Sequence, residues 1–356
     1  MPSPIRRGVL AAVVALSSVA LAACGSTGAP GGASASGSAP ATLTVVTHDS
    51  FALSQPLRDR FEASTGLDVT YVAPGDAGSL VNQLVLTKGS PLGDVVFGID
   101  NTFAGRALAE GVVAPYRATG LPAADADALA ADGSGRLTPV DFGDVCVNAD
   151  TAWFAAQGLP VPVTLDDLAK PEYADLLVVP NAASSSPGLA FLVATVGAKG
   201  EAGWSDYWAQ LKGNGVLVAK DWTEAYTVQF SGSTGKGPRP LTVSYSTSPA
   251  FEVVDGAAPT TALLQTCFRQ VEYAGVIEGA ANPEGARAFI EFLLSPEVQA
   301  DIPGQMYMYP AVRSTPLPEE WVAFAPLSET PYEVPAADIA AHREAWIREW
   351  TSTVIG

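Results

Sequence analysis

Common catalytic motifs and metal-site motifs are missing from this sequence. It contains no HExxH, no GxSxG, no Walker-type phosphate loop and no CxxC pair, and each of these would mark a specific chemistry. Only two histidines are present, His48 and His342. A Ser–His–Asp site built on His48 stays open as an alternative, although nothing marks its nucleophile. The sequence therefore favours binding over catalysis, with no cofactor and no metal.

Basic residues are also few. The chain has 19 Lys and Arg against 37 Asp and Glu, which gives a net charge of −18. This balance argues against nucleic acid or an anionic lipid surface as a partner. It suits a cationic ligand, and it is also a common way of keeping a protein soluble.

The N-terminal segment predicts export. Residues 1–23 combine Arg6 and Arg7 with a short apolar run, as in a secretory signal peptide. The run ends in LAAC, which resembles the bacterial lipobox, so we expect Cys24 to be lipidated. The alternative is a chance or buried cysteine after an ordinary signal. Residues 24–40 then form a Gly/Ser/Ala-rich tether, and no later stretch is long and apolar enough to cross a membrane. We expect a body held at the outer face of the cytoplasmic membrane.

Two further cysteines, Cys146 and Cys267, make an even pair in an oxidising compartment. A disulfide between them is one expectation, and two reduced, buried cysteines are the other. Their separation matches no metal motif.

The first part of the body alternates between strand-like and helix-like segments. These segments are residues 41–47, 56–65, 67–72, 76–86 and 94–99. The order β-α-β-α-β predicts a parallel, doubly wound α/β sheet. Ligands of such sheets bind beyond the carboxyl ends of the strands. Polar residues at those positions are His48, Asp49, Asp76, Asp100 and Asn101.

A serine cluster opens a later helix. Ser184, Ser185 and Ser186 precede Pro187 and an apolar helical run. Hydroxyls, free N–H groups and the positive helix end could cradle an anion. The alternative is an N-cap that serves only the helix.

Four aromatic residues lie near turns between residues 220 and 251. Trp222 and Tyr226 are in KDWTEAY, and Tyr245 and Phe251 are in VSYSTSPAF. Such side chains can stack on a planar, cationic ring. They are also what an ordinary core contains.

These segments resemble the thiamine-binding proteins of ABC importers, a branch of the type II periplasmic binding proteins. The similarity runs from about residue 43 to residue 350. The segments that carry it are THDSF, DVVFGIDN, VDFG, SSSPGL, KDWTEAY, VSYSTSPAF, MYP and HREAWIREW. The resemblance implies a monomer of two α/β lobes that close over a ligand by hinge motion. Lobe 1 would comprise residues 41–142 and 270–356, and lobe 2 residues 143–269. The two crossing segments would then carry Cys146 and Cys267 side by side.

The resemblance also implies residue roles. Trp222, Tyr245 and Phe251 would contact the rings of thiamine, with Tyr226 as support. Carboxylates would pair with the aminopyrimidine or the positive ring, and hydroxyls would hold the hydroxyethyl end or its phosphate. The residues implied for the rings are Asp49, Asp100 and Asp141. Those implied for the other end are Ser184, Ser185 and Ser186, together with backbone N–H groups near Asp76 to Ser79.

The chain departs from the family pattern at two positions. His48 and Phe251 stand where the family often has tyrosine, so a shifted preference among thiamine, its phosphates and related pyrimidines stays open. Other ligands, such as a polyamine or a metal ion, are alternatives within binding proteins. Tyr307 and Tyr309 are not adjacent, which counts against the paired tyrosines of ferric relatives. A hydrolase using Ser185 or His48 is the alternative from another class.

Overall fold

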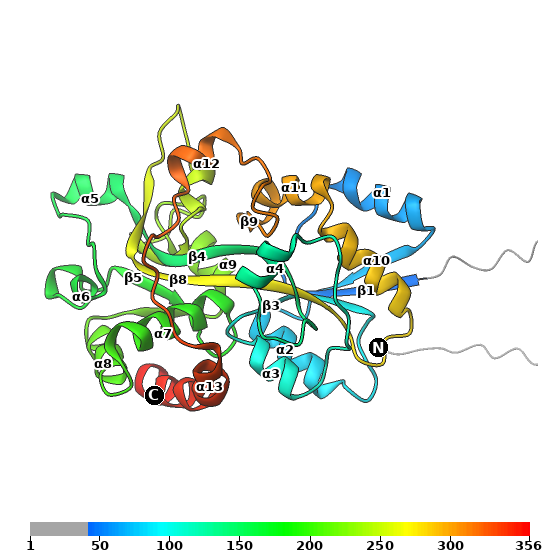
Figure 1. Ribbon diagram of the computed structural model, residues 1–356. Coiled ribbons are helices and arrows are strands. Elements are labelled where there is room, and N and C mark those ends of the chain that lie inside the picture. Colours follow the sequence, from blue (N-terminus) through cyan, green and yellow to red (C-terminus); the bar gives the residue numbers. More distant parts are fainter. Residues whose placement is uncertain (1–41) are drawn as a thin grey trace, which may run out of the picture. The chain divides into compact units, whose positions relative to one another are not determined.

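Two long antiparallel strands form the centre of the sheet. The computed structural model describes residues 42–356, and its longest strands are β4 (Thr138–Asp150) and β8 (Thr260–Val276) (Figure 1). Every residue of β4 is buried, as expected for a strand covered on both faces. Residues 260–276 form one continuous strand.

The other strands flank this pair in two parallel groups. The order is β2-β1-β3-β8-β4-β7-β5-β6, with β9 also paired to β4. Neighbours within each flanking group are parallel, whereas β3 with β8 and β4 with β7 are antiparallel. The parallel β-α-β-α-β unit predicted at the start is confirmed, and the sheet as a whole is mixed. The flanking strands are β1 Thr42–Thr47, β2 Asp68–Val72, β3 Val95–Asp100, β5 Leu177–Pro180, β6 Leu217–Ala219, β7 Leu241–Tyr245 and β9 Tyr309–Pro310.

Helices and short helical turns connect the strands. The α-helices are α1 Gln55–Thr65, α2 Ala77–Leu86, α3 Ala104–Ala109, α4 Ala123–Ala128, α5 Thr151–Gln157, α6 Leu165–Leu168, α7 Ser186–Lys199, α8 Trp204–Gly213, α9 Trp222–Glu224, α10 Pro283–Leu293, α11 Pro296–Met306, α12 Glu319–Phe324 and α13 Ala336–Trp350. The 3-10 turns are η1 Pro171–Tyr173 and η3 Ser248–Phe251, and the π-helical turns are η2 Ala225–Gln229 and η4 Thr351–Ile355.

Capping side chains satisfy free N–H groups at the starts of several helices. Thr164 and Asp167 form a capping box at α6. The Asn282 side chain accepts the N–H of Gly285 at the start of α10, and the Ser295 hydroxyl accepts the N–H of Val298 at the start of α11. Each cap of this kind stabilises a helix by about 1 kcal/mol.

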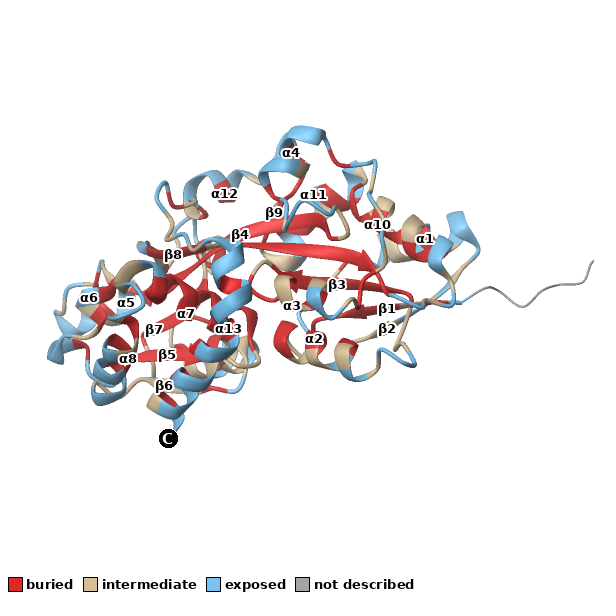
Figure 2. Ribbon diagram, turned by 60° about the horizontal axis from the view of Figure 1, so that its bottom comes forward, coloured by how far each residue is buried: buried red, intermediate tan, exposed pale blue. Residues whose placement is uncertain are grey.

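The strands of the sheet are mostly buried, whereas the helices that cover it expose one side to solvent. Figure 2 shows buried strands at the centre and exposed residues on the outer side of α13. The Trp350 ring of α13 meets Trp208 of α8 edge-on, with centroids 5.6 Å apart. At its other end α13 packs on α3, where a Cβ at Gly105 would lie 2.7 Å from the Cβ of Ala340. Since α13 contacts α8 of one flanking group and α3 of the other, its contacts do not assign it to one lobe. Its place in lobe 1 stays a prediction.

The structure joins Cys146 of β4 and Cys267 of β8 in a disulfide that spans 121 residues. Both cysteines are fully buried. We expect replacement of both by serine to lower the free energy of unfolding by about 2–5 kcal/mol, because the bridge restricts a long loop in the unfolded chain. Chemical denaturation of the oxidised wild type and of the double variant measures this difference. Two free thiols in the mass spectrum of the folded, unreduced protein would contradict the bridge.

The predicted signal peptide, the lipidation of Cys24 and the tether at residues 24–40 lie outside the described residues. Within residues 42–356, no helix has both the length and the apolar character needed to cross a membrane.

Candidate binding pocket

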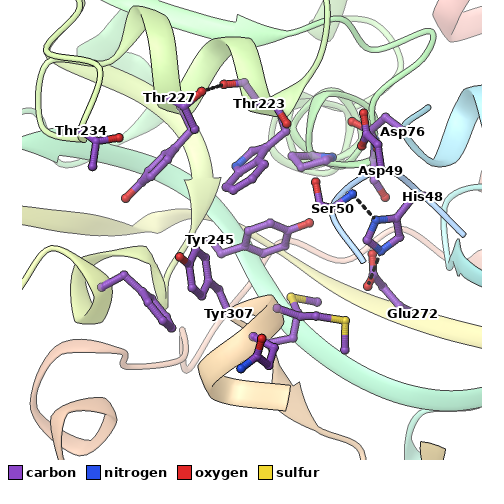
Figure 3. Close-up of a pocket in the computed structure, with 18 of the residues that line it drawn as sticks. His48, Asp49, Ser50, Asp76, Thr223, Thr227, Thr234, Tyr245, Glu272 and Tyr307 are labelled. Atoms are coloured by element: carbon purple, nitrogen blue, oxygen red, sulfur yellow. Dashed lines mark hydrogen bonds and ion pairs between the residues drawn. The ribbon is translucent and has the colours of Figure 1, made fainter. Parts of the chain in front are cut away.

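A pocket with a volume of about 420 Å³ opens where the ends of several elements meet (Figure 3). This volume is typical of small-molecule sites. The predicted binding residues that line it are His48, Asp49, Asp76, Ser186, Trp222, Tyr226, Tyr245 and Phe251. The other lining residues are Ser50, Pro187, Thr223, Thr227, Thr234, Glu252, Glu272, Gln305, Met306, Tyr307 and Met308.

Stacked aromatic rings form one wall of the pocket. Trp222 and Tyr226 stand one helical turn apart, and their rings stack with centroids 5.3 Å apart and planes 13° apart. Tyr245 meets Trp222 edge-on at 6.4 Å. The Trp222 indole N–H donates to the Ser244 hydroxyl at 2.9 Å, and the Tyr226 hydroxyl donates to Glu252 at 2.8 Å. Each ring is therefore held in place while part of the wall faces the cavity.

Two more aromatic residues come from distant segments. Phe251 of η3 packs against Tyr307, which follows α11. Tyr307 has a φ of 64°, a left-handed conformation that is uncommon for a residue other than glycine. Its carbonyl accepts the hydroxyl of Thr247. Strained backbone of this kind often occurs at functional sites, and Figure 3 shows Tyr307 beside Tyr245 in the cavity.

His48 connects the end of β1 to β8. The N–H of Ser50 donates to its Nδ1 at 3.1 Å, so this nitrogen carries a lone pair, and Nε2 lies 3.5 Å from a carboxylate oxygen of Glu272. Burial opposes protonation of His48, but Glu272, Asp76 and Asp49 outweigh it and raise its pKa. A second proton on the ring would cost the hydrogen bond from Ser50. In the hydrogen-bonded geometry the ring is therefore neutral, with its N–H toward Glu272.

Asp76 lies at the starts of two helices, α2 and α7. Its carboxylate accepts the N–H of Ala77 at 2.7 Å and the N–H of Ser186 at 3.1 Å. Beside it, the N–H of Gly78 donates to the carbonyl of Ser184 at 3.0 Å. Burial raises the pKa of Asp76, while these hydrogen bonds oppose the rise. The predicted anion cradle at α7 is thus already occupied in part by the protein's own carboxylate.

Two predicted acids, Asp100 and Asp141, are fully buried and do not line the cavity. Asp100 ends β3 and accepts the N–H of Thr102 at 2.6 Å and the hydroxyl of Ser186. Burial raises its pKa to about 6. Because Asp100 caps the turn after its own strand, direct contact with a ligand would require these bonds to break.

The other predicted residues outside the lining are Asn101, Ser79, Ser184 and Ser185. The Asn101 amide donates to the carbonyl of Arg269 at 3.0 Å and accepts the N–H of Val271 at 3.3 Å. Its side chain therefore binds the backbone of β8 and does not face the cavity. The Ser184 hydroxyl donates to the carbonyl of Lys220 at 3.2 Å. Asn101 and Ser184 thus satisfy backbone partners, whereas the Ser185 hydroxyl is buried and has no hydrogen-bond partner among the described residues.

Sequence reasoning missed several lining residues, of which Glu272, Glu252 and Tyr307 add the most chemistry. Glu272 had a usable signal, because an acidic side chain inside an apolar buried strand needs an explanation. Tyr307 immediately precedes the MYP segment that carried the family resemblance. Its place in the pocket depends on how α11 ends, which spacing alone does not reveal.

The described part of the chain, residues 42–356, contains no cluster of three or more His, Cys, Asp or Glu side chains arranged to hold a metal ion. The pocket is instead suited to a flat organic ligand. Its walls are aromatic and its charged lining side chains, apart from His48, are Asp49, Asp76, Glu252 and Glu272. Such a site attracts a cation with a planar ring.

Comparison with known proteins finds relatives over most of the chain. A family model described as bacterial extracellular solute-binding protein matches residues 90–339. A thiamine-binding periplasmic protein of Brucella suis is 30% identical over 320 residues, which cover 87% of this chain and 91% of that protein. The thiamine-binding periplasmic protein of Escherichia coli is 30% identical over 321 residues, which cover 88% of this chain and 93% of that protein.

Solved structures show the same fold. A periplasmic thiamin binding protein superposes with a TM-score of 0.76 at 30% identity, covering 88% of this chain and 96% of that chain. The periplasmic binding protein AfuA from Actinobacillus pleuropneumoniae, with fructose-6-phosphate bound, superposes with a TM-score of 0.72 at 16% identity, covering 89% and 99%. The fold is thus the two-lobed α/β fold of type II periplasmic binding proteins, and it serves different ligands.

Proposed function

The chain belongs to the bacterial extracellular solute-binding proteins, and we propose that it captures thiamine in this pocket for import. The observation that carries the proposal is the combination of a stacked aromatic wall, Trp222 with Tyr226 and Tyr245, and carboxylates around one cavity. Thiamine joins a flat aminopyrimidine to a cationic thiazolium ring. Aromatic faces attract such a cation, and carboxylates attract its charge. The thiamine-binding relatives support the same ligand.

We place the rings of thiamine against Trp222, Tyr245 and the Phe251–Tyr307 pair. The hydroxyethyl end would point toward Ser186 at the start of α7. The phosphate esters of thiamine are proposed as secondary ligands, because the Asp76 carboxylate must shift or take up a proton before a phosphate can reach those N–H groups.

Delivery follows from the family. We propose that a single copy of the protein, lipidated at Cys24 and held at the outer face of the cytoplasmic membrane, passes its ligand to an ABC permease. The strand groups on either side of β4 and β8 would be the two lobes, residues 41–142 with 270–356 and residues 143–269, and the long strands would be the hinge. The role proposed is that of a receptor without catalytic turnover.

Titration of the purified mature protein with thiamine tests the proposal. We expect saturable quenching of tryptophan fluorescence at micromolar thiamine, because Trp222 would stack on the ligand. Spermidine and thiamine monophosphate serve as competitors, to distinguish a polyamine site and to rank the esters. No saturable change with thiamine would contradict the proposed function. A chemically altered product would favour a hydrolase.

A further inference from the structure

Three acidic residues lie side by side in one row of the sheet. Glu272 of β8 is the register partner of Asp100 on β3 and also of Asp141 on β4. Side chains of register partners project from the same face and lie about 5 Å apart. All three are buried, with exposures of 0% for Asp100, 4% for Glu272 and 0% for Asp141. Only Glu272 of this row reaches the pocket lining.

The two outer acids of the row differ in their partners. Asp100 is well supplied with donors, from Thr102 and Ser186. Both carboxyl oxygens of Asp141 are buried and have no hydrogen-bond partner among the described residues. Burial, together with the neighbouring Glu272, raises the pKa of Asp141 well above its usual value. Two adjacent buried carboxylates without a cation are unfavourable, and one shared proton relieves the repulsion.

Other charged and polar groups around Glu272 do not neutralise the row. His48 presents its Nε2 at 3.5 Å and is neutral in its hydrogen-bonded geometry. The Gln270 amide donates to Glu272 and to the Tyr245 hydroxyl, both at 3.1 Å. Burial raises the pKa of Tyr245 well above its usual value, so its hydroxyl keeps its proton.

The remaining ionisable groups belong to neighbouring elements. Asp49 follows β1 and Asp76 precedes α2, and each adds negative charge near His48. Arg343 of α13 is the guanidinium whose charge interacts with Asp100, at the end of the row away from Asp141. The pair of Asp141 and Glu272 therefore has an acidic surrounding on its pocket side.

We propose that Asp141 and Glu272 share one proton in the ligand-free protein and release it to water when an organic cation occupies the pocket, so that the pair selects the ligand for its charge. On release one carboxyl O–H bond breaks, the proton passes to the buffer, and a carboxylate remains beside the cation. No electrons are transferred. Asp141 is a positioning residue here, since it acts through Glu272. The inference rests on the proposed function, because it takes thiamine as the cation.

The direction of the pH effect follows from this linkage. A positive charge beside Glu272 favours the ionised pair, so binding lowers the pKa of the pair and protons are released. Thiamine affinity then rises with pH, by at most about tenfold per pH unit while the pair titrates, and levels off once the ligand-free pair is ionised.

Calorimetry of thiamine binding at pH 7, in buffers with different ionisation enthalpies, counts the protons released. We expect a measurable release, at most about one proton, from the wild type and almost none from Asp141→Asn or Glu272→Gln. Glu252→Gln is the matched control. It removes a carboxylate that lines the same pocket but lies outside the row, and it should leave the proton count unchanged whatever its effect on affinity.

A ligand-free measurement separates this inference from the proposed function. Infrared spectroscopy of the wild type should show a protonated buried carboxyl that disappears on addition of thiamine and is absent from Asp141→Asn. If the ligand-free band is absent, or if wild type and Asp141→Asn release equal numbers of protons, the shared proton is wrong while thiamine capture stands. If the wild type does not bind thiamine at any pH, the proposed function is wrong, and the proposed selection for charge, which depends on it, is wrong as well. If Asp141→Asn does not fold, the wild type alone tests the shared proton. Its infrared carboxyl band must be present without ligand and must disappear when thiamine is added.

Discussion

Replacement of Trp222 by alanine is expected to weaken thiamine binding by about 30- to 150-fold. The substitution removes one stacking face, worth about 0.5–1.5 kcal/mol, and a cation–π contact worth about 1.5 kcal/mol, which lies between the values for exposed and for desolvated sites. Their sum of about 2–3 kcal/mol corresponds to this loss of affinity, because 1.4 kcal/mol is a factor of ten. The indole also donates to the Ser244 hydroxyl at 2.9 Å, so the variant leaves that hydroxyl with one partner fewer.

Isothermal calorimetry measures this effect without relying on tryptophan fluorescence. Trp222→Phe should recover most of the affinity, since it keeps an aromatic face. Trp153→Ala is the matched control, because Trp153 is a partly buried tryptophan of α5 that does not line the pocket. Equal affinities for the Trp222→Ala and Trp153→Ala variants would show that the aromatic wall does not contact the ligand.

The aromatic wall shows what the sequence could predict of the site. Trp222, Tyr226 and Tyr245 lie next to turns, a position that leaves both a ligand wall and an ordinary core open, and the pocket brings the three together. Likewise, polar residues after parallel strands predicted the position of His48, Asp49 and Asp76. Both inferences depend on local order along the chain, which the sequence displays directly.

The acids of the central strands show what it could not predict. Asp141 is predicted to contact the ligand, but only Glu272 of its register pair lines the cavity. The two side chains project from the same face of the sheet, so the difference lies in which of the neighbouring strands borders the cavity. That depends on how the helices and loops pack over the sheet, which spacing along one strand does not reveal. The contact between Gly78 and Ser184 also depends on the packing of α2 against the start of α7. No spacing in the sequence encodes that approach.

That contact leads to the second large effect. In Gly78→Ala, the added Cβ would lie 2.8 Å from both the Cα and the carbonyl oxygen of Ser184. Atoms this close must move apart, and overpacking of this kind costs about 1–3 kcal/mol. The two residues belong to the strand groups proposed as opposite lobes. We therefore expect the open, ligand-free form to tolerate the methyl group and the closed, ligand-bound form to be penalised.

The expected result for Gly78→Ala is a loss of thiamine affinity of about 5- to 150-fold, with the thermal midpoint of the ligand-free protein unchanged or slightly raised, because alanine favours helices. Gly213→Ala is the matched control, since it also replaces a helical glycine and its Cβ would meet no atom within 4 Å. Calorimetry and thermal unfolding of the three proteins separate affinity from stability. If Gly78→Ala instead binds thiamine like the wild type, ligand capture does not require α2 and α7 to meet at this point, and the proposed closure is wrong there.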